Sequence, residues 1–361
     1  MSFPFLQPYA GLSNSLQTAQ AGGAGGVGGW VELGRTTLGS SQDEIDVTSL
    51  PDKRYYMVLM DLHGASGNPE VRMNFNNDTG SNYASRGSQN GGADYTDINQ
   101  TSMELNGSNN NDDRFAFSHI ANFASKEKLM IAQHMSNNGA GAANAPNLRS
   151  ETVHKWVNTS NSISSIRPFF LSGRTYGSGS ECVVLGWDPA DTHTSNFWEE
   201  LASVTLGSDG DVLSSGTISA KKYLWVQAFI KNSGDTARFN TQVTFNNDTG
   251  SNYAMRRSID GGSDSTSTNA SNLFSSGVTG SNDDLWCMNL FIVNNASNEK
   301  LCIAHGFDTY IGSGAGNAPS QRYEAVGKWT NTSNQITEID ITNSDTSNYD
   351  SISELRVWGA D

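Results

Sequence analysis

The ten residues Phe75-Asn-Asn-Asp-Thr-Gly-Ser-Asn-Tyr-Ala84 occur a second time, unchanged, at residues 245–254. Shorter identical segments flank both copies in the same order. They include Thr37-Leu-Gly-Ser40 and Thr205-Leu-Gly-Ser208, Asn144-Ala-Pro146 and Asn317-Ala-Pro319, and Asn158-Thr-Ser-Asn161 and Asn331-Thr-Ser-Asn334. An internal repeat is the first feature to establish, because it determines how many times one structural unit is present.

The spacing between matched residues is about 170, which is longer than a solenoid unit of ~20–50 residues and close to the size of a complete domain. We therefore predict two tandem homologous domains at residues 30–190 and 197–361, joined by a linker at residues 191–196. Residues 1–29 lie outside the repeat.

The composition indicates an acidic protein that is rich in turns. In 361 residues, 22 Lys and Arg against 37 Asp and Glu give a formal net charge of −15, which argues against nucleic acid and against a membrane surface as partners. No apolar run is long enough to span a membrane. The N-terminus lacks the basic and apolar regions of a secretory signal, so a protein that leaves the cell would use another route.

The three cysteines form no disulfide framework and no metal-ligand spacing. Their apolar neighbours predict buried thiols. In the second repeat, Cys287 and Cys302 correspond to Ala116 and Met130 of the first, and this apolar replacement favours the same interpretation.

Each repeat contains short apolar segments that are typical of β-strands. The strongest are residues 54–60, 114–120 and 182–185 in the first repeat, and residues 223–230, 285–293 and 355–358 in the second. Seven or eight strands in about 160 residues predict an all-β fold: two tandem antiparallel β-sandwich domains, jelly-roll-like, preceded by an extended N-terminal arm. Residues 85–113 and 133–154 are expected to be long loops that carry binding or packing.

The N-terminal segment combines apolar side chains with a glycine tether, Ala21-Gly-Gly-Ala-Gly-Gly-Val-Gly-Gly29. It is too short to fold alone. It is therefore either a disordered terminus or a docking arm that orders against another subunit. The candidate assembly residues of the arm are Phe3, Phe5, Leu6, Tyr9, Leu12 and Leu16.

The repeated decapeptide has two interpretations. Its alternating oxygen-bearing side chains are similar to the ligands of a calcium loop, although each copy has one carboxylate and lacks the closing bidentate Glu. The candidate Ca²⁺ ligands are Asn76, Asp78 and Asn82 in the first copy and Asn246, Asp248 and Asn252 in the second. The other interpretation is a tight turn, since Asn-Asp-Thr-Gly tolerates positive φ angles. We expect no cofactor, with calcium as the alternative.

Trp156 and Trp329 each precede an Asn-Thr-Ser-Asn segment. An exposed tryptophan can stack on a sugar ring, so both are candidate sugar-binding residues; the alternative is a core tryptophan in each repeat. The pairs Asp112-Asp113 and Asp283-Asp284 are candidates for polysaccharide hydrolysis, and solvated turn residues are the competing interpretation. No acyl-transfer, nucleotide-binding or metalloprotease motif is present, so no catalytic residue is predicted.

The chain as a whole resembles virion structural proteins of tailed bacteriophages, especially marine ones. The residues that carry this resemblance are the arm Phe3-Pro-Phe-Leu-Gln-Pro-Tyr9, the glycine tether, the repeated decapeptide and the closing Glu354-Leu-Arg-Val-Trp-Gly359. The resemblance covers most of the chain and transfers no catalytic or binding residue. It implies a β-sandwich protein that is assembled in the host cytoplasm, is located in the virion and is anchored through its arm.

The sequence therefore predicts a non-enzymatic virion structural protein, used in capsid decoration, in a fibre or beside a tail. Its expected partners are other virion proteins, bound through the arm, and further copies of itself. The alternative is a carbohydrate-binding tandem module that recognises a glycan on the host surface. A remote alternative is a polysaccharide-degrading enzyme that uses Asp112 or Asp283. The carbohydrate-binding alternative requires Trp156 and Trp329 to be exposed.

Overall fold

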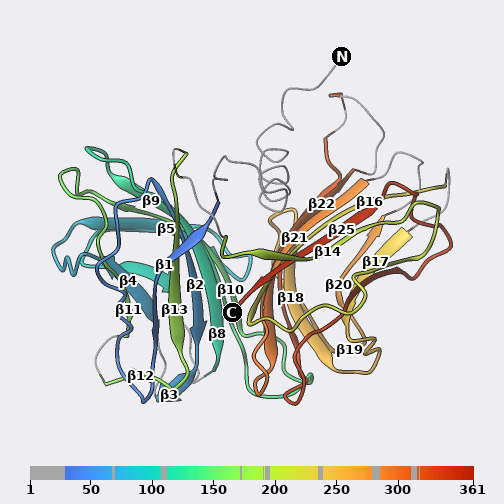
Figure 1. The fold of residues 1–361 in the computed structure, drawn as a ribbon, viewed down its shortest axis with the longest axis horizontal. Coiled ribbons are helices and arrows are strands. Elements are labelled where there is room, and N and C mark those ends of the chain that lie inside the picture. Colours follow the sequence, from blue (N-terminus) through green and yellow to red (C-terminus); the bar gives the residue numbers. More distant parts are fainter. Residues whose placement is uncertain are drawn as a thin grey trace.

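The computed structural model describes residues 29–361, except 67–69, 107–111, 171–172, 190, 192–195, 235–238, 279–284, 310–314 and 317. It is an all-β protein with two antiparallel β-sandwich domains, which confirms the predicted fold class (Figure 1). We call the part with strands β1–β13 domain 1 and the part with β14–β25 domain 2. The boundary residues 190 and 197 stay a prediction.

The large sheet of domain 1 has eight antiparallel strands in the order β1-β13-β2-β8-β9-β10-β5-β6. Their bounds are β1 Val31–Thr37, β13 Glu181–Trp187, β2 Tyr55–Leu62, β8 Arg114–Ala121, β9 Lys128–Ser136, β10 Leu148–Trp156, β5 Tyr83–Gln89 and β6 Tyr95–Gln100. Two smaller sheets complete the domain. One contains β11 Ile166–Phe169, β4 Val71–Phe75 and β7 Met103–Asn106, and the other contains β12 Thr175–Tyr176 and β3 Gly64–Ser66.

The large sheet of domain 2 repeats this order strand for strand, as β14-β25-β16-β21-β22-β23-β18-β19. Their bounds are β14 Glu199–Thr205, β25 Glu354–Ala360, β16 Tyr223–Lys231, β21 Leu285–Val293, β22 Lys300–Thr309, β23 Gln321–Trp329, β18 Tyr253–Ile259 and β19 Ser265–Ala270. The opposing sheet has four strands: β15 Val212–Ser214, β24 Ile339–Asn343, β17 Phe239–Phe245 and β20 Leu273–Val278.

The central strands of each large sheet are buried on both faces. In β2, Val58 and Met60 face the interior of the domain 1 sandwich, whereas Met57 and Leu59 face domain 2. A near-continuous apolar run is typical of such a strand, because neither of its faces meets water. The same reasoning explains the apolar run Leu-Phe-Ile-Val that ends β21.

The outer faces of the two large sheets pack against each other and form a third apolar core, which we call the seam. Phe117 of domain 1 and Phe291 of domain 2 meet there with ring centroids 4.4 Å apart. The other buried apolar residues of the seam are Met57, Leu59, Phe115, Met135, Val183 and Leu185 from domain 1, and Trp198, Tyr223, Val293, Leu301, Ile303, Val326, Trp358 and Ala360 from domain 2. An interface this apolar favours one rigid body over two mobile domains.

The repeated decapeptide forms a tight turn in both domains. Asn76 and Asn77 have φ angles of 53° and 52°, and Asn246 and Asn247 have 52° and 56°. The side-chain oxygen atoms of four of the six candidate Ca²⁺ ligands accept hydrogen bonds from protein donors: Asn76, Asp78, Asn246 and Asp248. The side-chain oxygen of Asn76 accepts hydrogen bonds from the backbone N–H groups of Ser164 and Ser165 at 2.7 and 3.1 Å. The structure therefore favours the turn, and its geometry does not support the calcium site.

The turn has one central carboxylate that joins it to a buried tryptophan. Asp78 accepts hydrogen bonds from Trp156 Nε1 at 2.7 Å, from the backbone of Gly80 and from the Asn82 amide. Asp248 accepts the same set from Trp329, Gly250 and Asn252. Burial opposes ionisation of Asp78 and Asp248, yet these hydrogen bonds outweigh it and hold the pKa of each carboxyl below its ordinary value.

The prediction that Trp156 and Trp329 bind a sugar is wrong. Trp156 is 0% exposed and Trp329 is 1% exposed, so neither ring can stack on a ligand from solution. Each ring packs inside its own sandwich, beside Phe75 in domain 1 and Phe245 in domain 2. The core alternative holds, and the Asn-Thr-Ser-Asn segment after each tryptophan lies at the surface.

The sequence predicted too few strands. The expected loop at residues 85–113 contains β6 and β7, and the expected loop at residues 133–154 contains most of β10. Strands β6 and β19 read Tyr-Thr-Asp-Ile-Asn-Gln and Ser-Thr-Ser-Thr-Asn-Ala. Because such edge strands are exposed on both faces, their composition is that of a loop and their pairing is invisible in the sequence.

Cys182 and Cys302 are buried free thiols, as predicted, whereas Cys287 is half-buried. Cys287 is opposite Phe229 in domain 2, and Phe115 is opposite Asp61 in domain 1. Because Phe229 and Asp61 hold equivalent positions, the counterpart of Cys287 is Phe115 and not the predicted Ala116. This one-residue difference places it on the outer face of the sheet. Helices able to cross a bilayer are absent from the described part of the chain.

Candidate binding site

The structure does not bring the sequence-predicted site residues together. The arm at residues 3–16 lies outside the described residues, as do Asp283 and Asp284. In the other carboxylate pair, Asp112 accepts a hydrogen bond from the backbone N–H of Gly139 at 2.8 Å, and Asp113 lies beside His63. The two aspartates thus have separate partners, which gives each of them a structural role.

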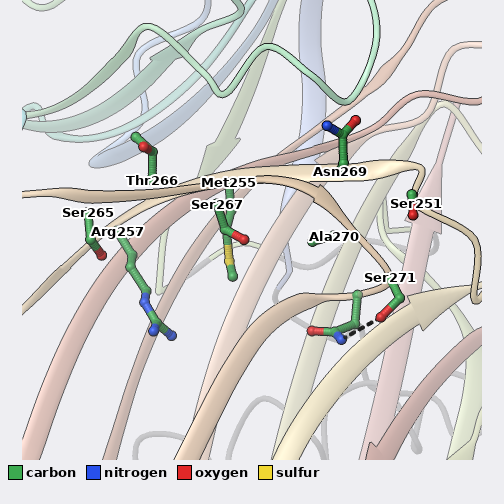
Figure 2. Close-up of a pocket in the computed structure, with 10 residues that line it drawn as sticks. Ser251, Met255, Arg257, Ser265, Thr266, Ser267, Asn269, Ala270 and Ser271 are labelled. Atoms are coloured by element: carbon green, nitrogen blue, oxygen red, sulfur yellow. Dashed lines mark hydrogen bonds between the residues drawn. The ribbon is translucent and has the colours of Figure 1, made fainter.

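A polar hollow of about 500 Å³ opens in domain 2, where the outermost strand β19 leads into β20 (Figure 2). Its lining residues are Ser251, Met255, Arg257, Ser265, Thr266, Ser267, Asn269, Ala270, Ser271 and Asn272. Hydroxyl and amide side chains predominate among them. We call this feature the β19 hollow.

The pairing of β18 with β19 determines which side chains enter the β19 hollow. Met255 is opposite Ser267, and Arg257 is opposite Ser265. Residues that are opposite each other share one face of a sheet, and Figure 2 shows these side chains on the same side of the ribbon. The register shifts between Tyr253 and Met255, and together with the positive φ of 49° at Asn269 this bends the chain toward β20.

The chemistry of the β19 hollow suits a ligand that is rich in hydroxyl groups. Hydroxyl and amide groups both donate and accept hydrogen bonds, and so match the alternating donors and acceptors of a sugar. Met255 is only 6% exposed and adds an apolar contact for C–H groups. Arg257 adds a guanidinium, the group that pairs best with a carboxylate. Acidic sugars therefore fit this lining.

Domain 1 has the same hairpin with different side chains. Tyr95 is opposite Gly87. In domain 2, Ser265 takes the position of Tyr95 and Arg257 that of Gly87. The phenol oxygen of Tyr95 lies 2.9 Å from the place that a Cβ on Gly87 would occupy, so the ring covers this glycine. Asp97 replaces Ser267 in the next pair. Tyr95 thus lies over Gly87 in domain 1, where domain 2 has Ser265 beside Arg257.

A second hollow, of about 450 Å³, lies where the two domains meet. His63 is one of its lining residues, with Nδ1 3.2 Å from Asp113 Oδ1 and Nε2 3.6 Å from Asp61 Oδ2. Two residues of domain 2 complete the cluster. Lys222 Nζ is 3.2 Å from Asp61 Oδ2, and the Asn298 amide donates to Asp113 at 3.1 Å. We call this group the His63 cluster.

The His63 cluster is a charged bridge across the seam. Burial opposes protonation of His63, but the hydrogen bond with Asp113 and the charge of Asp61 outweigh it and raise the pKa of His63 above its ordinary value. Burial likewise opposes ionisation of Asp113, and the interaction with His63 lowers its pKa. Both ring nitrogens of His63 face carboxylates, so the ring serves as a structural link rather than as a general base.

Glu151, His305 and Glu324 form a third polar group at the seam, with one ligand atom of each within 4.8 Å of the others. Arg149 lies 2.8 Å from Glu151, and Arg322 lies 2.7 Å from Glu324. Two guanidinium groups thus already compensate the carboxylates and would repel a cation. We interpret this group as an ion-pair network that joins the domains.

Neither a protein-family model nor a curated protein matches the chain. Among solved structures, domains LG4-5 of the mouse laminin alpha1 chain are 8% identical over 91% of this chain and 89% of that chain, with a TM-score of 0.20. The tail fiber protein gp63.1 of an E. coli phage is 7% identical over 88% of this chain and 35% of that chain, with a TM-score of 0.19. These are remote similarities between β-sandwich proteins, and they assign no family.

Sequence reasoning missed both hollows. The β19 hollow is formed by Ser, Thr and Asn residues that are abundant throughout the chain, so nothing distinguishes them singly. The available signal was the contrast between repeats, in which Tyr95 is replaced by Ser265 and Gly87 by Arg257. The His63 cluster combines both domains, and only the packing of the sheets reveals it.

Proposed function

We propose that this protein is a non-enzymatic virion attachment protein, and that its β19 hollow binds carbohydrate on a cell surface. One observation carries the proposal. A hydroxyl- and amide-lined hollow opens in domain 2 around Ser265 and Arg257, whereas domain 1 has Tyr95 lying over Gly87 at these positions. A duplicated domain whose two copies differ at one concave polar site is suited to binding there, because the shared scaffold holds the site rigidly.

Two further features support a structural rather than a catalytic role. The seam joins the sandwiches through a continuous apolar core, as expected of a stiff element in a particle. Among the described candidates for hydrolysis, Asp112 is engaged with the backbone of Gly139 and Asp113 with His63. In this proposal, assembly takes place in the host cytoplasm, and residues 1–29 anchor the chain to other virion proteins.

The binding proposal is tested with a glycan array probed with labelled protein. We expect the wild type to bind a defined set of glycans, with acidic sugars prominent. The variant Ser265→Tyr carries the domain 1 residue into the β19 hollow and is expected to bind at least about tenfold more weakly. Thr268→Tyr is the matched control, because Thr268 is exposed on the same strand but does not line the hollow.

The virion proposal is tested separately, with particles purified from a host that carries the gene. We expect the full-length chain in these particles and the loss of a chain that begins at residue 30. Equal incorporation of both chains would contradict anchoring through the arm. Undiminished glycan binding by Ser265→Tyr would contradict the assignment of the β19 hollow.

A further inference from the structure

On the outer face of its large sheet, domain 2 has a patch of residues that contacts domain 1, and we call this patch a socket. The apolar floor of the socket is Leu301, Ile303 and Val326, which are 1%, 4% and 0% exposed because domain 1 covers them. An ion pair forms the rim, with Lys328 Nζ 3.0 Å from Glu299 Oε2. We call these five residues the domain 2 socket.

The turn that follows β9 of domain 1 sits on the rim of the domain 2 socket. Glu299 accepts hydrogen bonds from the backbone N–H of Gly141 at 2.6 Å and from the Asn137 amide at 2.8 Å. Lys328 donates to the backbone oxygen of Gly139 at 2.8 Å. Glu299 and Lys328 thus interact with each other and also form hydrogen bonds with the turn. These hydrogen bonds offset the desolvation cost of burying the two charges.

Domain 1 carries the same five residue types at the same places in its own large sheet. They are Glu127, Leu129, Ile131, Val153 and Lys155, and we call them the domain 1 socket. Ile131 pairs with Val153 as Ile303 pairs with Val326. Leu129 pairs with Lys155 in the same way as Leu301 pairs with Lys328.

The two sockets differ in exposure and not in chemistry. Leu129, Ile131 and Val153 are 56%, 62% and 46% exposed. The ion pair between Lys155 and Glu127 is intact at 3.2 Å, with both side chains more than two-fifths exposed. Three adjacent exposed aliphatic side chains form an apolar patch, and such patches mark interaction sites. If the two domains were related by an exact two-fold axis, each domain would cover the socket of the other. In the structure, domain 1 covers the domain 2 socket, whereas the domain 1 socket is exposed.

The chain also contains a second candidate for filling a socket. Met135, at the end of β9, is buried in the seam, and its counterpart Phe307 in β22 is 42% exposed. The turn that caps the domain 2 socket reads Gly139-Ala-Gly-Ala-Ala-Asn-Ala-Pro146 and returns as Gly312-Ser-Gly-Ala-Gly-Asn-Ala-Pro319. Residues 312–314 and 317 lie outside the described residues, so the match there is one of sequence.

We infer that the domain 1 socket binds domain 2 of a second copy of this chain, through the face that carries Phe307. Among the described residues, each chain then offers one exposed socket and one exposed Phe307, and these are different surfaces, which makes the contact heterologous. Heterologous contacts generate a ring when the rotation closes and a filament when it does not. This inference does not depend on the virion proposal, because it concerns only contacts between copies of the protein.

The test is the mass of the full chain measured by light scattering over a dilution series. We expect the wild type to assemble, and Ile131→Asp and Phe307→Asp each to fall to the single-chain mass of 38.8 kDa. Both side chains are exposed, so the variants should fold, which circular dichroism checks. Ile98→Asp is the control, because Ile98 is 69% exposed on β6 and lies outside the socket.

A mixing experiment distinguishes a heterologous contact from other modes of assembly. Ile131→Asp keeps its filling face and Phe307→Asp keeps its socket, so an equimolar mixture is expected to form a dimer that neither variant forms alone. A wild type that stays a single chain at every concentration would overturn the inference. So would assembly that survives Ile131→Asp, or a mixture that remains monomeric.

Discussion

Asp78 and Asp248 make the same hydrogen bonds in the two domains, whereas the hairpins beside them have diverged. In domain 1, Tyr95 covers Gly87, and in domain 2, Ser265 and Arg257 line an open hollow. The outer faces have diverged in a different way, because identical sockets are covered in domain 2 and exposed in domain 1. The interior of this fold is thus shared by the two copies, and the differences that bear on function are at the surface.

The largest expected effect concerns the part that the two domains share. Trp156→Ala and Trp329→Ala each remove a fully buried indole, and we expect each to reduce the free energy of unfolding by about 3–5 kcal/mol. Denaturant unfolding followed by circular dichroism measures this effect. The comparison predicts similar losses for the two variants. A tryptophan whose removal costs little would show that the two cores are not equivalent.

The next effect concerns identical ion pairs in different surroundings. Glu299→Ala leaves Lys328 buried without its carboxylate, and we expect a loss of about 3 kcal/mol. Glu127→Ala breaks the equivalent exposed pair and is expected to cost less than about 1 kcal/mol. Thermal unfolding of dilute protein compares the two variants. Equal costs would contradict the difference in burial between the sockets.

A smaller effect concerns the pH dependence of the seam. Because the pKa of His63 is raised in the folded protein, its stabilising contribution is complete below the ordinary value of 6.5 and is lost as the pH rises through the raised value. The pKa of Asp113 is lowered, so its contribution is present above 3.8 and is lost as the pH falls. Stability measured against pH should therefore show a smaller alkaline decline in His63→Gln than in the wild type.

The control for this measurement is His154→Gln. His154 is buried, and burial lowers its pKa to about 3, so this residue weakens the fold at acidic pH instead. The difference in stability between wild type and His63→Gln, followed against pH, separates the contribution of the His63 cluster from that of the other histidines. An alkaline decline that is unchanged in His63→Gln would rule out His63 as the titrating group.

The sequence was sufficient to predict the duplication, the all-β class and the turn at Asn76 and Asn77, because each depends on local pattern. It was not sufficient to decide what Trp156 does, since a tryptophan followed by Asn and Ser is compatible with a core position, which the structure shows, and with a sugar-binding surface. The edge strands β6 and β19 were missed because their polar residues carry no alternation.

The seam illustrates the second limit of the sequence. Leu129 and Leu301 occupy the same position and have the same chemistry, yet one is 56% exposed and the other 1%. No local pattern distinguishes them, because the difference arises from how the two sandwiches pack. The residues Met57 and Leu59 gave a partial signal, since their strand is apolar on both faces.

The measurement that tests the account most directly is a nuclear magnetic resonance titration of the labelled full chain with a glycan selected by the array. The two hairpins serve as site and internal control within one molecule. We predict shifts of the backbone amides of Ser267 and Asn269 in domain 2, with those of Asp97 and Asn99 in domain 1 unchanged. Equal shifts in both hairpins, or shifts confined to other parts of the protein, would contradict the assignment of binding to the β19 hollow.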